Sequence, residues 1–140
     1  METFKLHQQL QQDCIELLDF PLSKLLLLND KNYPWFVLVP RVADVKEIFQ
    51  LDWQDQQQLL NESSLLAELL ATFFNADKLN IAALGNMVEQ LHIHHIVRYK
   101  NDACWPAPVW GKLSAITYSE DEINDLKAKL LPQLTSILAK

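Results

Sequence analysis

Short apolar stretches, bounded by proline or turn-forming residues, run along the chain and predict a β-sheet. Residues 25–28 are all leucine, and residues 35–39 are all apolar between two prolines, which is typical of strands buried on both faces. The polar sequence at 29–32, Asn-Asp-Lys-Asn, has turn chemistry, so these two stretches should form an antiparallel pair. The predicted strands are 14–18, 23–28, 35–39, 79–84 and 89–98.

Other stretches repeat apolar residues at helical spacing. A short leading helix is predicted at 6–13, where Leu6 and Leu10 lie four residues apart. A long amphipathic helix should begin after Asp52, which has the chemistry of an N-cap, and run to about Phe73. Its apolar positions are Leu59, Leu60, Leu65, Leu66, Leu69, Leu70 and Phe73.

A final helix is predicted over residues 119–138. Ser119 and Glu122 stand at the spacing of a capping box, and Pro132 should kink or break the helix. The predicted fold class is therefore α+β: an antiparallel sheet of about five strands, a long helix after the third strand and a C-terminal helix.

Composition narrows the class of protein. The chain has 140 residues, 49% of them apolar, with no Gly-, Ser- or Pro-rich linker, so we expect one domain over 1–140. A net charge of −6 argues against nucleic acid as a partner. The run Leu25–Leu28 is far too short to span a membrane, the first residues do not resemble a secretion signal, and Cys14 and Cys104 are too few for a disulfide framework. These features predict a cytoplasmic protein.

Three of the four histidines lie within four positions, in the predicted strand 89–98. Side chains alternate between the faces of a strand, so His92 and His94 should share a face and His95 should lie on the other. The first face would carry Gln90, His92, His94 and Ile96, and the second Leu91, Ile93, His95 and Val97. Three interpretations compete: two ligands of a metal site, histidines hydrogen-bonded within a polar sheet, or an imidazole nucleophile with a neighbouring proton-transfer group.

The stretch Gly85–Arg98, Gly-Asn-Met-Val-Glu-Gln-Leu-His-Ile-His-His-Ile-Val-Arg, resembles the signature of the histidine triad (HIT) superfamily. The resemblance extends to the Asn-Asp turn, to the strand Tyr33–Pro40 and to the segment Asp102–Gly111, which contains Trp-Pro-Ala-Pro-Val-Trp-Gly. It is strongest to bacterial HIT-domain hydrolases with such a tail. The resemblance implies a HIT-like fold and chemistry at a nucleotide phosphate.

The resemblance also assigns roles within the signature. His92 falls on the family's nucleophile and His94 on the histidine that contacts the phosphate and assists proton movements. Gln90 stands where the first histidine usually is; its amide can donate or accept a hydrogen bond but cannot titrate. Asn86 falls on the amide residue that binds a phosphate oxygen or the leaving group. His95 stands where the family has an apolar residue, which favours a packing role.

Several residues outside the signature are candidates for nucleotide binding. Asn29 and Asp30 correspond to the family's ribose-binding position, although the same residues could serve only as a turn. Asn80 could close the pocket or end a strand. Trp105 and Trp110, in the proline-rich part of the segment 99–118, suit a flap over a pocket, a subunit interface or packing against the sheet.

The resemblance thus implies a nucleotide hydrolase or nucleotidyl transferase that acts at the α-phosphate of a nucleotide ester or phosphoramidate, such as a dinucleoside polyphosphate. His92 would carry the nucleotidyl group as a covalent intermediate. The scheme requires no cofactor and no protein-bound metal, although a divalent ion can arrive with the substrate phosphates. The resemblance implies a homodimer as well. The alternative is a catalytically weak nucleotide-binding or interaction protein that retains the pocket, and Gln90 is the feature that favours it.

Overall fold

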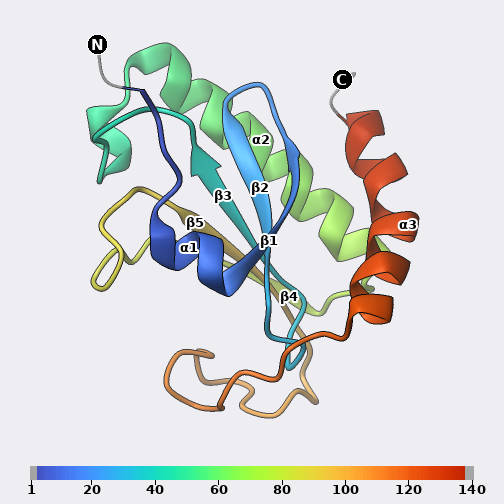
Figure 1. Cartoon of the computed structure of the whole chain (residues 1–140). Helices are drawn as coiled ribbons and strands as arrows, with labels where there is room; N and C mark the ends of the chain where they lie inside the picture. The colour runs from blue at the N-terminus through green and yellow to red at the C-terminus, as the bar shows by residue number, and fades with distance from the viewer. Residues whose placement is uncertain (1–2, 138–140) are drawn as a thin grey trace.

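The computed structural model describes residues 3–137, in which five strands form one antiparallel sheet in the order β1-β2-β3-β5-β4 (Figure 1). The α+β class, the five strands and the long helix after the third strand are as predicted. The strands are β1 (Cys14–Asp19), β2 (Ser23–Leu28), β3 (Trp35–Pro40), β4 (Lys78–Ala82) and β5 (Ile93–Arg98). The helices are α1 (Gln8–Asp13), the 3-10 helix η1 (Ile48–Gln50), α2 (Trp53–Phe73) and α3 (Glu120–Ile137).

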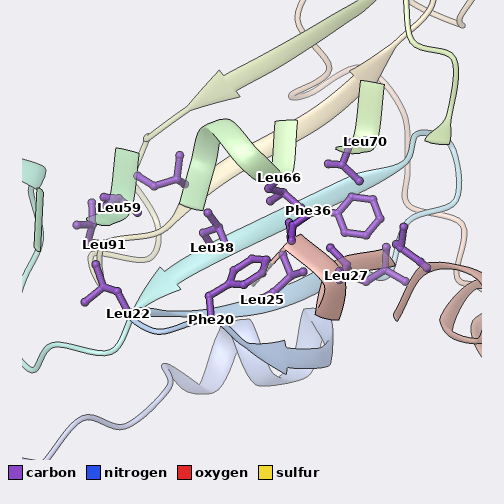
Figure 2. Packing of buried hydrophobic residues seen from close by; sticks show 14 of the residues in the cluster. Phe20, Leu22, Leu25, Leu27, Phe36, Leu38, Leu59, Leu66, Leu70 and Leu91 are labelled. Carbon is purple, nitrogen blue, oxygen red and sulfur yellow. The ribbon is translucent and has the colours of Figure 1, made fainter. Parts of the chain in front are cut away.

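The larger core lies on the sheet face that α2 and α3 cover. Leu66 and Leu70 of α2 are fully buried against Phe36 of β3, and Leu130 and Leu134 of α3 join the same cluster. Figure 2 shows the leucines of α2 lying over the sheet around Phe36. Residues 25–28 of β2 and 35–39 of β3 are apolar on both faces of the sheet, and no residue of either strand is exposed.

The opposite face is covered by α1, by the segment that leads into it and by part of the segment after β5, so α1 and α2 lie on opposite sides of the sheet (Figure 1). Leu6 and Leu10 pack there against Val37 and Ile96, and Val109 reaches the same cluster from the C-terminal side. The second layer is therefore built from short, irregular pieces.

The histidine strand is shorter than predicted. β5 begins at Ile93, not at residue 89, because the backbone before it turns away from the sheet: the Leu91 N–H donates to the carbonyl of Val45 at 2.9 Å. The alternation of faces nevertheless continues through His92, since Leu91, Ile93 and Val97 are in the larger core and Ile96 is in the smaller one.

The predicted caps are present, and of the two outcomes expected at Pro132, a kink or a break, the break does not occur. The Asp55 N–H donates to Asp52 at 2.8 Å, and the Glu122 N–H donates to Ser119 Oγ at 3.1 Å. Helix α3 continues through Pro132 to Ile137, where the described residues end, so predicted residue 138 lies outside them. Burial of Leu130 and Leu134 on either side of the proline holds the helix together despite the missing hydrogen bond. None of the helices within residues 3–137 is long and apolar enough to cross a membrane.

Candidate active site

His92 and His94 lie side by side on the face of the sheet that α1 covers in part. His92 immediately precedes β5, and His94 is its second residue. The centroids of the two imidazoles are 4.9 Å apart with the ring planes at 72°. Both residues are more than nine-tenths buried, so a ligand could reach only the exposed edge of each ring.

The proton of the His92 ring is held on the nitrogen that faces the protein. Its Nδ1 lies 2.7 Å from the backbone carbonyl oxygen of Gln90. A carbonyl oxygen can only accept, so Nδ1 carries the proton and donates it. In the neutral ring the other nitrogen, Nε2, then has a free lone pair and can act as a nucleophile.

His94 has the opposite arrangement. The indole N–H of Trp35 donates to His94 Nδ1 at 2.9 Å, and an indole nitrogen can only donate. Nδ1 is therefore unprotonated, and the neutral ring carries its proton on Nε2. Burial, together with the neighbouring His92 and His95, lowers the pKa of His94 to about 3, so His94 is a neutral donor at neutral pH.

His95 points to the other side of the sheet and takes no part in this pair. Its Nδ1–H donates to the Ile93 carbonyl at 3.1 Å, which leaves Nε2 to accept from the Ser63 hydroxyl of α2 at 2.7 Å. Burial lowers the pKa of His95 to about 4, partly opposed by the hydrogen bond to Ile93. These contacts agree with the packing role predicted for it.

The side chain of Gln90 faces the N-terminal segment and is occupied at both ends. Its Oε1 accepts from the backbone N–H of His7 at 2.8 Å, and its Nε2 donates to the backbone carbonyl of Lys5 at 2.8 Å. This pair of bonds, the Gln90 clamp, fastens residues 5–7 beside His92. The hydrogen bonds that this amide can make, as considered for the position of the first histidine, are made here to backbone groups of Lys5 and His7.

An aromatic pocket of about 380 Å³ opens next to His94. Its walls include Trp35 and Trp110, whose rings meet edge to face at 5.6 Å, and Trp110 also lies 5.3 Å from the His94 ring. The full lining is Gln12, Asp13, Leu28, Asn29, Asp30, Tyr33, Trp35, Val109, Trp110, Gly111, Leu113, Ala115 and Thr117. Trp110 thus lies against the sheet of its own chain and forms a wall of this pocket.

Asn29 and Asp30 both line the aromatic pocket, and both also bind the C-terminal segment. The Asn29 side chain accepts from the Tyr118 N–H at 2.8 Å, and Asp30 Oδ1 accepts from the Asn32 amide at 2.7 Å and from the Ile116 N–H at 3.3 Å. Asn29 and Asp30 therefore form the predicted turn and also line the pocket, so the two alternatives for these residues do not exclude each other.

A polar cavity of about 500 Å³ lies on the other side of the histidine pair. Asn86 lines it with Gln90 and Lys46, and these last two also line the small hollow beside His92. His7 contributes as well, and the remaining lining residues are Asp44, Val45, Met87 and Glu89. Asn86 is exposed and lies away from the aromatic pocket, so the candidate residues fall on two sides of His92.

Comparison with known proteins adds a match to the HIT domain family model over residues 9–101, about two thirds of the chain. The chain belongs to the HIT domain family. Members of this family generally act on nucleotides, and many are hydrolases. The α+β fold is accordingly the HIT-like fold expected from the signature.

Three solved structures of bacterial histidine triad proteins are similar over nearly the whole chain. The protein from Marinobacter aquaeolei VT8 is 49% identical, with a TM-score of 0.94, and covers 96% of this chain and 98% of its own. The protein from Bradyrhizobium japonicum is 44% identical, with a TM-score of 0.92 and coverage of 95% and 99%. The protein from Sinorhizobium meliloti 1021 is 42% identical, with a TM-score of 0.90 and coverage of 93% and 96%. The search of curated proteins found no match.

Asn80 and Trp105 lie around a buried arginine and not at the histidine pair. Arg98 is 1% exposed and donates to Asp102 at 2.8 Å, to Asn80 Oδ1 at 2.8 Å and to the Ala107 carbonyl at 2.9 Å. Its guanidinium also lies 5.5 Å from the centre of the Trp105 ring. Arg98, the last residue of the signature, therefore holds the segment 99–118, which contains Trp110, against the sheet.

Trp35 is the residue at the site that the sequence analysis did not propose as functional. One signal was available: an indole N–H in a buried strand requires an acceptor, and the two histidines on the same face could supply one. No group of three or more His, Cys, Asp or Glu side chains within residues 3–137 is placed to hold a metal ion.

Proposed function

We propose that this HIT protein is a nucleotide hydrolase or nucleotidyl transferase that attacks the α-phosphate of a nucleotide ester or phosphoramidate through His92. The observation that carries the proposal is the pair of opposite tautomers. His92 offers a lone pair on Nε2 because its Nδ1–H is bound at 2.7 Å, and His94 offers an Nε2–H because its Nδ1 accepts at 2.9 Å. A nucleophile beside a hydrogen-bond donor suits attack on a phosphoryl group.

In the first step, the His92 Nε2 lone pair forms a bond to the α-phosphorus, and the bond from phosphorus to the leaving group breaks with its electron pair on the leaving group. The ring of the nucleotidyl-histidine carries a positive charge, and the Gln90 carbonyl bound to Nδ1–H stabilises that charge. The leaving group takes up the proton it needs from solvent. In the second step, water attacks phosphorus and releases a proton to solvent, the bond to Nε2 breaks, and the neutral imidazole returns. An acceptor other than water would make the reaction a transfer.

We place the nucleoside in the aromatic pocket. Its volume of about 380 Å³ lies within the range of small-molecule sites, and the indole faces and edges of Trp35 and Trp110 suit a planar base. Asp30 and Asn29, which line the same pocket, are the residues that we propose for the ribose hydroxyls. In this pose the α-phosphate points toward His94.

We place the leaving group in the polar cavity on the other side of His92, where Asn86 is the candidate donor to the departing atoms. Lys46 and Gln90 line both this cavity and the hollow beside His92, which makes the two spaces neighbours. The scheme needs no protein-bound metal; a divalent ion can arrive on the phosphates of the substrate.

We further propose that the protein acts as a homodimer in the cytoplasm. β4 is the last strand of the sheet, and apolar side chains stay exposed at that edge: Ile81 and Leu84 are 50% and 47% exposed, and Leu60 of α2, which is 63% exposed, lines one hollow with Ile81. Such a patch suits a second copy of the chain. The unpaired cysteines Cys14 and Cys104 suit a reducing compartment.

The test uses purified protein with a fluorogenic adenosine phosphoramidate and with diadenosine polyphosphates. His92→Ala should abolish turnover of whichever substrate is used while retaining AMP binding by calorimetry, because Ala removes the nucleophile and leaves the aromatic pocket intact. Mass spectrometry of wild-type protein quenched at alkaline pH should detect the nucleotidyl adduct on His92. Turnover that survives in His92→Ala would refute the proposal.

His95→Gln is the matched control, since it changes a neighbouring histidine on the opposite face. Gln can still accept from the Ser63 hydroxyl, so the variant should fold and turn over substrate. A second candidate function, nucleotide binding without efficient turnover, is favoured by the Gln90 clamp, which takes up the side chain at the position of the first histidine. It predicts AMP binding without turnover of either substrate.

A further inference from the structure

The contact between Trp35 and His94 couples two neighbouring strands across the site. Trp35 in β3 is opposite Ile96 of β5, and Val37 is opposite His94, so Trp35 is the diagonal neighbour of His94 on the same face of the sheet. A long aromatic side chain can span that diagonal. The indole N–H reaches His94 Nδ1 at 2.9 Å with both groups buried.

The indole itself has little freedom to move away from this contact. Trp35 is 7% exposed, and its ring meets Tyr33 edge to face at 6.5 Å and Trp110 at 5.6 Å. The His94 ring lies 5.6 Å from Trp35 and 5.3 Å from Trp110. The donor is therefore held in place by packing, and it fixes the orientation of the imidazole that accepts from it.

A donor at this position excludes one of the two neutral forms of His94. If Nδ1 carried a proton, two N–H groups would face each other in a buried site, and each would lose its hydrogen bond. The remaining neutral form has its proton on Nε2. Within residues 3–137, no side chain or backbone group accepts a hydrogen bond from this Nε2. The one buried side-chain N or O atom without a partner in that part of the chain is Ser23 Oγ, so His94 Nε2 is not sealed off from a ligand.

We propose that Trp35 is a positioning residue that holds His94 Nδ1 as an acceptor and thereby directs the Nε2–H of His94 at the phosphoryl group. The inference rests on the proposed function for the identity of that ligand, while the tautomer itself is a property of the free protein. His94 is then a fixed neutral donor to a phosphoryl oxygen. The proton that the leaving group takes up comes from solvent water, because the His94 ring has a single proton and keeps it.

The test records the ring ¹⁵N resonances of His94 in the free protein at neutral pH. In the wild type, Nδ1 should show the shift of an unprotonated acceptor and Nε2 that of a protonated nitrogen. Trp35→Phe keeps an aromatic ring but has no N–H. Site-specific replacement of Trp35 by 3-benzothienylalanine keeps the shape of the indole and puts sulfur in place of the N–H, which guards against a variant that fails to fold.

In both variants the Nδ1 resonance should lose its hydrogen-bond shift and a population with the proton on Nδ1 should appear. Trp110→Phe, which changes the other indole beside His94 but removes no hydrogen bond, should keep the wild-type ¹⁵N pattern. With a substrate that the wild type turns over, kcat should fall about tenfold in the benzothienyl variant with KM retained, because the shape of this pocket wall is unchanged. That fall is less than the roughly 10²–10³ lost when a transition-state donor is removed outright.

Identical ¹⁵N shifts in the wild type and the benzothienyl variant would overturn the inference, and so would an unchanged kcat in that variant. The failure of the proposed function has a different signature. In that case no nucleotide is turned over, yet the wild-type tautomer and its loss in the variants are still observed, because the NMR measurement needs no substrate.

Discussion

Replacement of Gln90 by alanine removes the Gln90 clamp and tests what this side chain does at the position of the first histidine. The side chain makes two neutral hydrogen bonds of 2.8 Å to the backbone of Lys5 and His7. Each such bond contributes about 0.5–1.5 kcal/mol. Both backbone groups are at exposed positions, where water can replace the amide. We therefore expect the free energy that holds the N-terminal segment in place to fall by about 1–2 kcal/mol, the lower half of the range for two such bonds.

The N-terminal segment should loosen without leaving the protein. Leu6 and Leu10 stay buried at 9% and 5% exposure, and burial of a leucine contributes roughly 1.5–3 kcal/mol. A loss of one to two kcal/mol raises the population of the opened segment roughly five- to thirtyfold. Hydrogen exchange of the His7 amide, which donates to Gln90 Oε1, measures that change directly.

The effect on turnover should be small, because the part of Gln90 that orients His92 is its backbone carbonyl, which alanine retains. We expect kcat to fall by less than about tenfold, against roughly 10²–10³ for a lost phosphoryl donor. Gln9→Ala is the matched control: it removes a glutamine bonded to Asp13 in α1 and leaves the clamp intact. A fall of a hundredfold or more in Gln90→Ala, with His7 exchange unchanged, would show that the amide contacts the phosphate and refute this reasoning.

Two further predictions concern stability. The pKa values of His94 and His95 are lowered from 6.5 to about 3 and about 4, so between these values and 6.5 the unfolded state binds more protons. The free energy of unfolding should have its full value above pH 6.5 and should fall as the pH drops from 6.5 toward 4, by at most about 1.4 kcal/mol per pH unit for each histidine. Urea midpoints that stay constant between pH 7 and pH 5 would contradict this prediction. Asp102→Asn should lower the free energy of unfolding by about 3 kcal/mol because it leaves the buried Arg98 charge without its carboxylate; an unfolding curve that matches the wild type would show that the pair contributes nothing.

Local patterns in the sequence were enough for the fold class and for the order of the elements. Period-two and helical spacing depend on residues that are neighbours in the chain, so strands, caps and the faces of the histidine stretch could be predicted from them. The same alternation correctly separated His95 from His92 and His94. The start of β5 at Ile93 could not be predicted, because a hydrogen bond from Leu91 to the distant Val45 decides it.

The partners of the site residues were decided by tertiary structure. Gln90 binds residues more than eighty positions away, and Trp35 and His94 are 59 positions apart. A residue type states which hydrogen bonds a side chain can make, but packing of distant segments determines which group lies within reach. The sequence by itself therefore determined that imidazoles would face one side of an antiparallel sheet. Only the folded chain decided which ring nitrogen of each carries the proton, because the Gln90 carbonyl and the Trp35 indole reach them through tertiary contacts.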